Sequence, residues 1–231
     1  LRGELFNDES VQRVLKEGNV LGLFTDYVKY PRTYHLPWSP GATKDDRIME
    51  SDNAFHNKKV IVTLKMDGEN TTIYNDYVHA RSISFDGHPS RNRIKALQAR
   101  IGHDIPKGWR LCGENVTAVH SIEYYNLEDY FLLFSIWNEK NECLNWYNTV
   151  EWAGLLNLHT VPLLYNDIYD RSKITSTIDP YLATNEGYVI RLYDSFPYSQ
   201  FRNSVGKFVR KNHVQTHGHW MREAVKYNTV M

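Results

Sequence analysis

The feature that most constrains the fold is a β-branched run that stops at a tight-turn signal. Residues Lys59–Lys65 read Lys-Val-Ile-Val-Thr-Leu-Lys, and Asp67-Gly68 follows almost at once. β-branched residues favour extended backbone, and an Asp-Gly pair favours reversal of the chain. Strand-forming residues resume at Asn70–Tyr74 and again at Tyr77–Ile83. The pattern predicts an antiparallel meander that begins with Lys59–Lys65.

Further apolar runs extend this prediction to a mixed fold. Strands are predicted at Trp109–Val116, Tyr130–Trp137, Gly187–Tyr193 and Gly206–Lys211, and helices at Glu9–Gly18, Arg91–Ile101 and Val150–Leu156. The strands outnumber the helices, and short turns join most of them. This arrangement indicates an α+β fold with antiparallel sheets.

Composition excludes some classes of protein and leaves nucleic-acid binding open. The 231 residues include 27 Lys+Arg and 27 Asp+Glu, so the net charge gives no sign of a nucleic-acid partner. A neutral protein can still contain a locally basic cleft. The isolated Cys112 and Cys143 argue against a disulfide framework and favour a reduced, cytoplasmic setting. No apolar run is long enough to span a membrane, and we expect a single monomeric domain over residues 1–231.

The chemistry of the chain points to Lys65, at the end of the first predicted strand. A protonated lysine is a poor nucleophile, and burial beside other cations would lower its pKa and free its lone pair. Gly68 lets the backbone turn tightly and lets a phosphate group approach. A Lys-x-Asp-Gly segment also arises by chance as a surface turn, so its interpretation depends on the rest of the chain.

Six short segments, all on predicted strands or at their ends, support a catalytic interpretation. In chain order they are Lys65–Gly68, His79–Ser82, Leu111–Asn115, Tyr130–Trp137, Glu186–Arg191 and Gly206–Asn212. Their order and content resemble motif I, the arginine motif after it, and motifs III, IIIa, IV and V of the covalent nucleotidyltransferases. This superfamily comprises DNA ligases, RNA ligases and mRNA capping enzymes. The Tyr30-Pro-Arg lead-in and Asn70 make the chain most similar to RNA ligases.

The resemblance implies two antiparallel sheets around a nucleotide cleft, and a ligase that uses ATP with Mg²⁺ or Mn²⁺. It implies that Lys65 attacks the α-phosphate of ATP to give lysyl-AMP. The AMP then moves to a 5′-phosphate end, and a 3′-hydroxyl displaces it. Each step builds negative charge on phosphate oxygens, so the site needs cations. The implied partners are RNA ends, including those of a nicked duplex, and the implied role is RNA repair.

The same resemblance implies roles for individual side chains. Glu186 would hold the metal, Glu114 would accept hydrogen bonds from ribose hydroxyls, and Phe134 would stack on adenine. Arg81 would grip a phosphate with its planar guanidinium. The implied nucleotide-binding set is Leu64, Lys65, Asn70, Arg81, Glu114, Phe134, Lys207 and Lys211. Core packing is the alternative for Phe134, and a solvated surface position is the alternative for Glu114 and Arg81.

Some positions depart from the superfamily pattern. Ser135 stands where an acid often follows the phenylalanine, and Val209 interrupts the usual pair of lysines two residues apart. Strand alternation places Lys207 and Lys211 on one face. Lys207 is therefore the first candidate for the α-phosphate, with Lys211 or the preceding arginine second. Leu64, just before the nucleophile, indicates recognition of the base mostly by backbone groups, which leaves GTP open as the nucleotide.

Two regions outside the motifs, the segment before the first predicted strand and the histidines near the C-terminus, also contain side chains that can bind ligands. Residues Tyr30–Gly41 contain three prolines and several aromatic residues, so they form an ordered loop and not a helix. We expect this lead-in segment to border the nucleotide pocket and expect Arg32 and His35 to support ATP use. The three histidines between residues 213 and 219 have a spacing that can bind zinc, but surface or packing roles are the simpler interpretation because no cysteine accompanies them.

The region after the last motif bears on the kind of ligase. About twenty residues follow Asn212, too few for the five-stranded OB barrel that DNA ligases and capping enzymes usually carry there. We therefore expect no C-terminal OB-fold and a short C-terminal extension at 213–231, which favours an RNA ligase over a DNA ligase or an RNA-capping guanylyltransferase. A non-catalytic nucleic-acid-binding module is a further alternative, against which the presence of Lys65, Glu114 and Glu186 argues.

Overall fold

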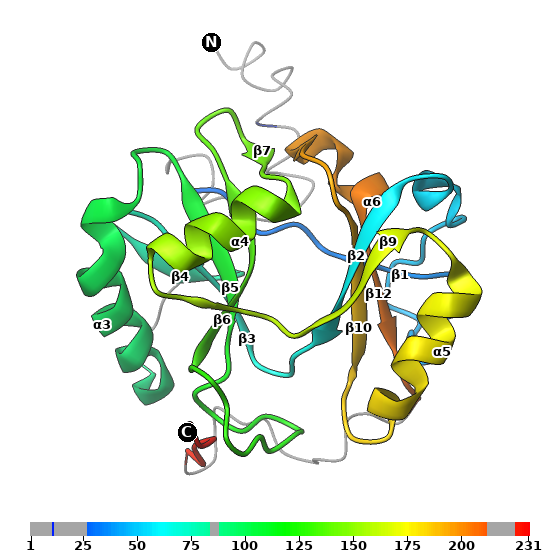
Figure 1. Cartoon of the computed structure of the whole chain (residues 1–231). Helices are drawn as coiled ribbons and strands as arrows, with labels where there is room; N and C mark the ends of the chain where they lie inside the picture. The colour runs from blue at the N-terminus through cyan, green and yellow to red at the C-terminus, as the bar shows by residue number, and fades with distance from the viewer. Residues whose placement is uncertain (1–10, 12–26, 84–87, 212–224) are drawn as a thin grey trace.

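Two β-sheets lie side by side, and the longer helices pack on their outer faces (Figure 1). The computed structural model describes residue 11 and residues 27–83, 88–211 and 225–231. The predicted helix Glu9–Gly18 lies almost wholly outside these residues, and the three histidines between 213 and 219 lie entirely outside them.

The first sheet has five strands in the order β1, β12, β10, β2 and β9. Their bounds are Tyr34–His35 (β1), Val205–Val209 (β12), Gly187–Leu192 (β10), Lys59–Lys65 (β2) and Leu163–Ile168 (β9). β1 and β12 pair in parallel, and the other neighbours are antiparallel. Strand β10 lies between β2 and β12, so it brings the two lysine-bearing strands to within one strand of each other.

The second sheet joins β11, β7, β6, β5, β3 and β4 in that order, and β8 pairs with β6. Their bounds are Phe196–Pro197 (β11), Glu142–Cys143 (β7), Phe131–Trp137 (β6), Arg110–Asn115 (β5), Glu69–Ile73 (β3), Val78–Ala80 (β4) and His159–Thr160 (β8). All pairs are antiparallel except β6 with β8. The chain passes from β2 to β3 through residues 66–68, so the Lys-x-Asp-Gly turn links the two sheets.

Three helices cover the outer faces of the sheets (Figure 1). Their bounds are Asn92–Ile101 (α3), Trp146–Leu155 (α4) and Arg171–Leu182 (α5), and α6 is the single turn Phe201–Ser204. Short 3-10 helices occupy Asn53–Phe55, Pro89–Arg91, Gly102–Asp104 and Tyr198–Gln200. Helices α3 and α4 bury their apolar residues against the second sheet, and α5 buries its own against the first. These three helices leave the inner faces of the two sheets uncovered, and those faces border the space between the sheets.

Helix α5 was not predicted from the sequence, although its local signals are regular. The Asp170 side chain accepts a hydrogen bond from the backbone N–H of Lys173 at 3.0 Å and caps the first turn. Ile174 and Ile178, four residues apart, are both buried against the first sheet. Pro180 masks this pattern in the sequence, because a proline inside a helix removes one backbone hydrogen bond; it lies in the last turn of α5, close to the end of the helix.

The strand predictions agree with the structure most closely where apolar residues are continuous. Strand β2 has the predicted bounds, while the strand predicted at Tyr77–Ile83 is limited to Val78–Ala80. The strand predicted at Gly206–Lys211 was wrong at its end, because β12 stops at Val209. No helix in the described part of the chain has both the length and the apolar character needed to cross a lipid bilayer.

Candidate active site

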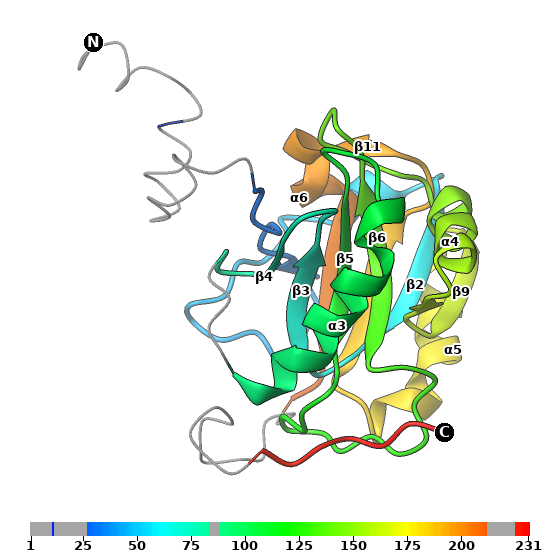
Figure 2. The same ribbon diagram turned by 90° about the vertical axis from the view of Figure 1, so that its left-hand side faces the viewer.

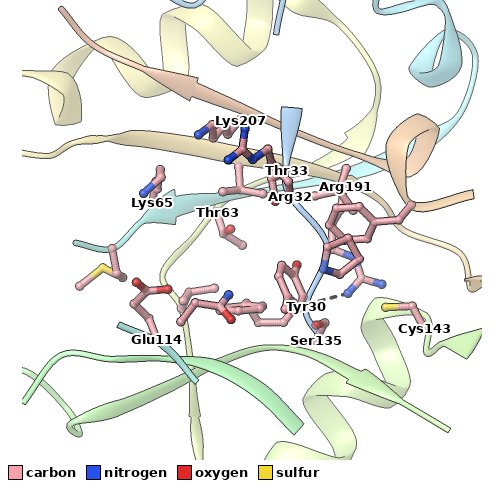
Figure 3. A pocket seen from close by; sticks show the side chains of 18 of the residues that line it. Tyr30, Arg32, Thr33, Thr63, Lys65, Glu114, Ser135, Cys143, Arg191 and Lys207 are labelled. Atoms are coloured by element: carbon pink, nitrogen blue, oxygen red, sulfur yellow. Dashed lines mark hydrogen bonds between the residues drawn. The ribbon is translucent and has the colours of Figure 1, made fainter. Parts of the chain in front are cut away.

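A cavity of about 270 Å³ opens between the two sheets and receives side chains from both. Seven of the residues singled out in the sequence line it: Leu64, Lys65, Asn70, Arg81, Glu114, Phe134 and Lys207. Figure 3 shows Lys65 and Lys207 on one side of the cavity, Glu114 on the opposite side, and Tyr30 farther along it. The fold thus brings together residues that are up to 143 positions apart in the sequence, from 64 to 207.

Lys65 ends β2 and makes a close ion pair with Glu186. The Lys65 Nζ atom lies 2.5 Å from Glu186 Oε2. This contact follows from the register of β2 and β10, in which Lys65 is directly opposite Gly187. Glu186, 6% exposed, immediately precedes β10, so its side chain reaches the amine from the neighbouring strand.

The backbone around Glu186 is held from the next strand. The Arg210 Nε atom donates to the Asn185 carbonyl at 2.7 Å, and the Arg210 backbone N–H donates to the Glu186 carbonyl at 3.0 Å. A Cβ atom at Gly187 would overlap the Phe208 carbonyl oxygen, so only glycine allows this close strand approach. Arg210 therefore supports the bend that presents Glu186, and its guanidinium is engaged with backbone.

The charge on Lys65 differs from the expectation based on its sequence position. Burial lowers the pKa of Lys65, but the carboxylates of Glu186 and Glu114 outweigh burial and hold the pKa above its usual value. The expectation that burial lowers the pKa of Lys65 overall was therefore wrong. Lys65 is protonated at neutral pH, and its lone pair becomes free only when this ion pair is broken.

Glu114 faces the nucleophile across the cavity. It lies on β5, directly opposite Asn70 of β3. Burial, partly offset by the positive charge of Lys65, raises the pKa of Glu114 to about 8. At neutral pH much of this carboxyl group is therefore protonated, and it can both donate and accept hydrogen bonds.

A third acid near the nucleophile, Asp67, holds the turn that follows it. Its Oδ2 atom accepts hydrogen bonds from the backbone N–H groups of Ser121 and Ile122 at 2.7 and 2.8 Å. Its own N–H donates to the Tyr124 hydroxyl at 2.9 Å. A Cβ atom at Gly68 would come 2.5 Å from the Asn115 carbonyl oxygen, which explains the glycine after the aspartate.

Asn70 and Arg81 meet on the other side of the turn. The Arg81 backbone N–H donates to the Asn70 carbonyl at 3.0 Å, and both side chains line the cavity. The Asn70 Oδ1 atom is buried, and no described residue donates a hydrogen bond to it. A buried amide oxygen without a donor is costly, so this atom is suited to a ligand that donates to it.

Aromatic side chains form the far end of the cavity. Phe134 lies edge-to-face with Tyr30, at a ring-centroid distance of 5.2 Å, and Tyr30 lies edge-to-face with Phe201 at 5.3 Å. Ser135, which replaces the acid common in the superfamily, accepts a hydrogen bond from the Trp137 indole N–H at 3.2 Å. This end of the cavity is therefore lined by aromatic rings, against which a purine base can pack.

Lys207 reaches the cavity from β12 and lies beside Asp46. The Lys207 Nζ and Asp46 Oδ1 atoms are 3.8 Å apart, and His35 Nε2 lies 3.4 Å from the same oxygen. Burial, together with the positive charge of Lys65, lowers the pKa of Lys207. Lys211 is exposed, lies beyond the end of β12 and is not among the residues that line the cavity. The prediction that Lys207 and Lys211 share a strand face was therefore wrong.

The lead-in segment borders the cavity, as its composition predicts. Tyr30 and Arg32 line it, and Arg32 is anchored by a hydrogen bond to the Asp45 carbonyl at 3.2 Å. His35 is only 2% exposed, and its Nδ1 atom lies 2.8 Å from the Ser39 hydroxyl oxygen. Arg32 therefore faces the cavity directly, whereas His35 does not line it and lies behind Asp46 and Lys207, which do.

The site offers a divalent cation one carboxylate close to the nucleophile. Within the described ranges no group of three or more His, Cys, Asp or Glu side chains is close enough to ligate a metal. Glu186 supplies one hard carboxylate close to the nucleophile. Mg²⁺ typically binds one or two carboxylates together with substrate phosphates, so a single acid beside a nucleotide cavity fits such an ion.

Comparison with known families identifies the group to which the chain belongs. The family model described as RNA ligase matches residues 58–209, which include Lys65, Glu114, Glu186 and Lys207. The chain therefore belongs to the RNA ligase family. No curated protein sequence matches it significantly.

Solved structures confirm the predicted fold class. A putative ATP-dependent DNA ligase from Aquifex aeolicus matches with a TM-score of 0.56 and 16% identity, over 80% of this chain and 50% of that one. An archaeal ATP-dependent RNA ligase matches with a TM-score of 0.54 and 16% identity, over 80% of this chain and 48% of that one. The chain thus has the α+β nucleotidyltransferase fold of these ligases and spans about half of their length.

Proposed function

We propose that this chain is the nucleotidyltransferase domain of an ATP-dependent RNA ligase with Lys65 as its nucleophile. The proposed reaction joins a 3′-hydroxyl to a 5′-phosphate through lysyl-AMP and an AMP-capped 5′ end, in RNA repair. The observation that supports it best is the placement of Lys65. Its side chain lines the cavity together with the cation of Lys207 and the ring of Phe134, and its amine is paired with the buried carboxylate of Glu186.

The proposed first step uses the amine of Lys65. Once deprotonated, Nζ attacks the α-phosphorus of ATP, a phosphoramide N–P bond forms, and the P–O bond to pyrophosphate breaks. A 5′-phosphate oxygen then attacks the lysyl-AMP phosphorus and releases Lys65. Finally a 3′-hydroxyl attacks the activated 5′-phosphorus, and AMP leaves. Negative charge builds up on nonbridging oxygens in each step, which is why cations near the reacting phosphate matter most.

The cavity suggests how the nucleotide is held. We place the adenine ring against Phe134, with Leu64 and its neighbours contacting the base edge through backbone groups. Asn70 and Glu114 face the sugar, because one has a buried oxygen without a donor and the other can both donate and accept. Lys207, which reaches the cavity beside Lys65, is placed on the α-phosphate.

Two arginine side chains of the cavity are candidates for binding phosphate groups. Arg81 and Arg32 both line the cavity, and we place them on phosphate groups of ATP or of the 5′ end. Glu186 is the proposed ligand for Mg²⁺ or Mn²⁺. Such an ion supplies neutralisation of phosphate charge when bound. Lys211 has no place in this assignment because it lies outside the cavity.

The test is covalent labelling with ATP that carries a radioactive α-phosphate. With Mg²⁺ the protein should retain label through a denaturing gel, and Lys65→Ala should retain none. Lys59→Ala is the matched control because it lies on the same strand but is exposed at the opposite end. Label that persists in Lys65→Ala would refute the assignment of the nucleophile.

The same assay separates the rival functions. Labelling by GTP and not by ATP would indicate a capping guanylyltransferase. Label from ATP followed by sealing of DNA ends alone would indicate a DNA ligase. Absence of label from either nucleotide, in a folded protein, would indicate a binding module that retains the fold.

A further inference from the structure

A C-terminal strap, residues 225–231, lies outside the part of the chain that matches the RNA ligase family. In Figure 2 it runs along the bottom of the molecule, beside the loop that connects β5 to β6. Backbone hydrogen bonds fasten it there, among them one from the Asn228 N–H to the Thr117 carbonyl at 3.1 Å and one from the Thr229 N–H to the Tyr124 carbonyl at 3.3 Å. Val119 N–H donates to the Lys226 carbonyl at 2.8 Å, Leu127 N–H to the Thr229 carbonyl at 2.9 Å, and Met231 N–H to the Leu127 carbonyl at 3.0 Å.

Asn228 is the centre of this attachment and is 2% exposed. Its Oδ1 atom accepts from the backbone N–H of Tyr124 at 2.8 Å. Its Nδ2 atom donates to the carbonyls of Val116 at 2.8 Å and Ala118 at 3.3 Å. The amide thus spans both ends of the loop segment 116–124 and uses both side-chain N–H groups and its oxygen.

The same loop segment grips the turn that carries the nucleophile. Tyr124, whose N–H is held by Asn228, accepts a hydrogen bond at its hydroxyl from the Asp67 N–H at 2.9 Å. The backbone N–H groups of Ser121 and Ile122 bind the Asp67 carboxylate. The turn that follows Lys65 is therefore fixed by a loop that is itself fixed by the strap.

We propose that Asn228 is a positioning residue for Lys65 and acts through Tyr124 and Asp67. This inference rests on the proposed role of Lys65 as the nucleophile. An attacking amine must be held within a fraction of an ångström of its line of approach, and small displacements of a reacting group lower rates steeply. Removing the amide releases the loop, the loop releases the turn, and the amine loses its fixed position.

Two variants and two matched controls test the proposal. Asn228→Ala removes the amide, and Tyr124→Phe removes the hydroxyl that holds Asp67 while keeping the ring packed. Lys226→Ala is the control on the strap, because its ion pair with Glu123 is at the surface and such pairs contribute little. Tyr125→Phe is the control on the loop, because Tyr125 is 68% exposed.

The first measurement is hydrogen exchange of the peptide that contains residues 64–70, followed by mass spectrometry below the melting temperature. We expect exchange there to be about tenfold faster in Asn228→Ala and Tyr124→Phe than in the parent and both controls. This readout does not depend on any ligase activity. Unchanged exchange in both variants would overturn the proposal, and Tyr124→Phe alone decides if Asn228→Ala does not fold.

The second measurement is the single-turnover rate of lysyl-AMP formation. At saturating ATP we expect a loss of about ten- to a hundredfold in each variant, with the KM for ATP within about twofold of the parent. The rate loss of the double variant should be no larger than that of the more impaired single variant, since both changes break the same chain of contacts. Fully additive losses would overturn the proposal. A parent protein that forms no lysyl-AMP would instead refute the proposed function, and hydrogen exchange would still decide the role of the strap.

Discussion

In the proposed reaction Lys65 must lose a proton before it attacks, and its neighbours determine how firmly that proton is held. Burial lowers the pKa of Lys65, whereas Glu186 and Glu114 raise it and prevail. The ion pair therefore favours the protonated, unreactive form of the amine. Formation of lysyl-AMP should accordingly accelerate as the pH rises.

Replacing Glu186 by glutamine should lower the pKa of Lys65. The substitution removes the negative charge 2.5 Å from Nζ and leaves the cost of burial, which favours the neutral amine. The pKa is measured from the pH dependence of Lys65 acetylation by acetic anhydride, read by mass spectrometry. Glu151→Gln, an exposed change on α4, is the control. An unchanged or higher pKa in Glu186→Gln would contradict the ion pair seen here.

Glu114→Gln should stabilise the protein at neutral and alkaline pH. Burial raises the pKa of Glu114 from 4.5 to about 8, so the folded state binds this proton more tightly than the unfolded state does. The stability this provides is fully present below about pH 4.5 and is lost as the pH rises towards 8. The variant should therefore gain at least about 1 kcal/mol at pH 8.5 and almost nothing at pH 4. Urea denaturation at the two pH values measures the difference, and equal gains at both would contradict it.

Single residues differ in how well their roles can be predicted from the sequence. Lys65 and Phe134 stand within short motifs of neighbouring residues, so the cavity contains them as expected. Tyr124 and Asn228 lie in segments without periodic apolar residues, and their bonds join positions 57 and 104 residues apart. Such contacts depend on how distant loops pack against one another, so a local sequence pattern cannot predict them.

Secondary-structure elements also differ in how well the sequence predicts them, and the lead-in segment is an example. Its proline-stiffened sequence predicts a border of the cavity, and Tyr30 and Arg32 do line it. Its pairing as β1 with β12 was not predicted, because a two-residue strand joined to residues more than 170 positions away gives no periodic signal. The edge strand β9 was not predicted from the sequence. Most of its residues are exposed, so its sequence lacks the regular apolar pattern of a buried strand.

Arg32→Ala and His35→Ala should have different effects, although their sequence context predicts similar ones. Arg32 is exposed at the cavity, so its loss should raise the KM for ATP about tenfold and leave the melting temperature nearly unchanged. His35 is buried beside Ser39 and Asp46, so its loss should also lower the melting temperature by several degrees, roughly as expected for about 1–2 kcal/mol. Calorimetry measures the melting temperature, and titration of the labelling reaction with ATP measures the KM. A melting temperature unaffected by His35→Ala would show that the buried histidine adds no stability.

On the scale of the whole molecule, a neutral chain surrounds a locally basic cavity. The charged residues that line it are Arg32, Lys65, Arg81, Arg191 and Lys207, with Asp46 and Glu114 as acids. The excess of cations at the cavity is balanced elsewhere in the chain, because the net charge is zero. Bulk charge therefore hides the feature that is most relevant to a polyphosphate substrate.

Sealing should depend on ribose at the 3′-hydroxyl end and tolerate deoxyribose on the 5′-phosphate side. The attacking strand must be aligned with the activated phosphate, and a site that pairs a 2′-hydroxyl leaves polar groups unsatisfied when that hydroxyl is absent. The loss should reach up to roughly 10⁴-fold. The assay uses nicked duplexes that differ only in the sugars beside the nick. Equal sealing of the all-DNA nick and of the RNA-ended nick would contradict RNA selectivity.

The pairing of Lys65 with Gly187 restricts how this chain can change in length. Successive side chains of a strand point to opposite faces, so one residue gained or lost within β2 would turn the amine away from Glu186. The lysine would still stand in the sequence and satisfy a motif search, yet its amine would be absent from the cavity. Insertions are therefore tolerable in exposed connections, such as residues 139–140 in the turn between β6 and β7, whereas a change in the residue count of β2 would displace the amine of Lys65.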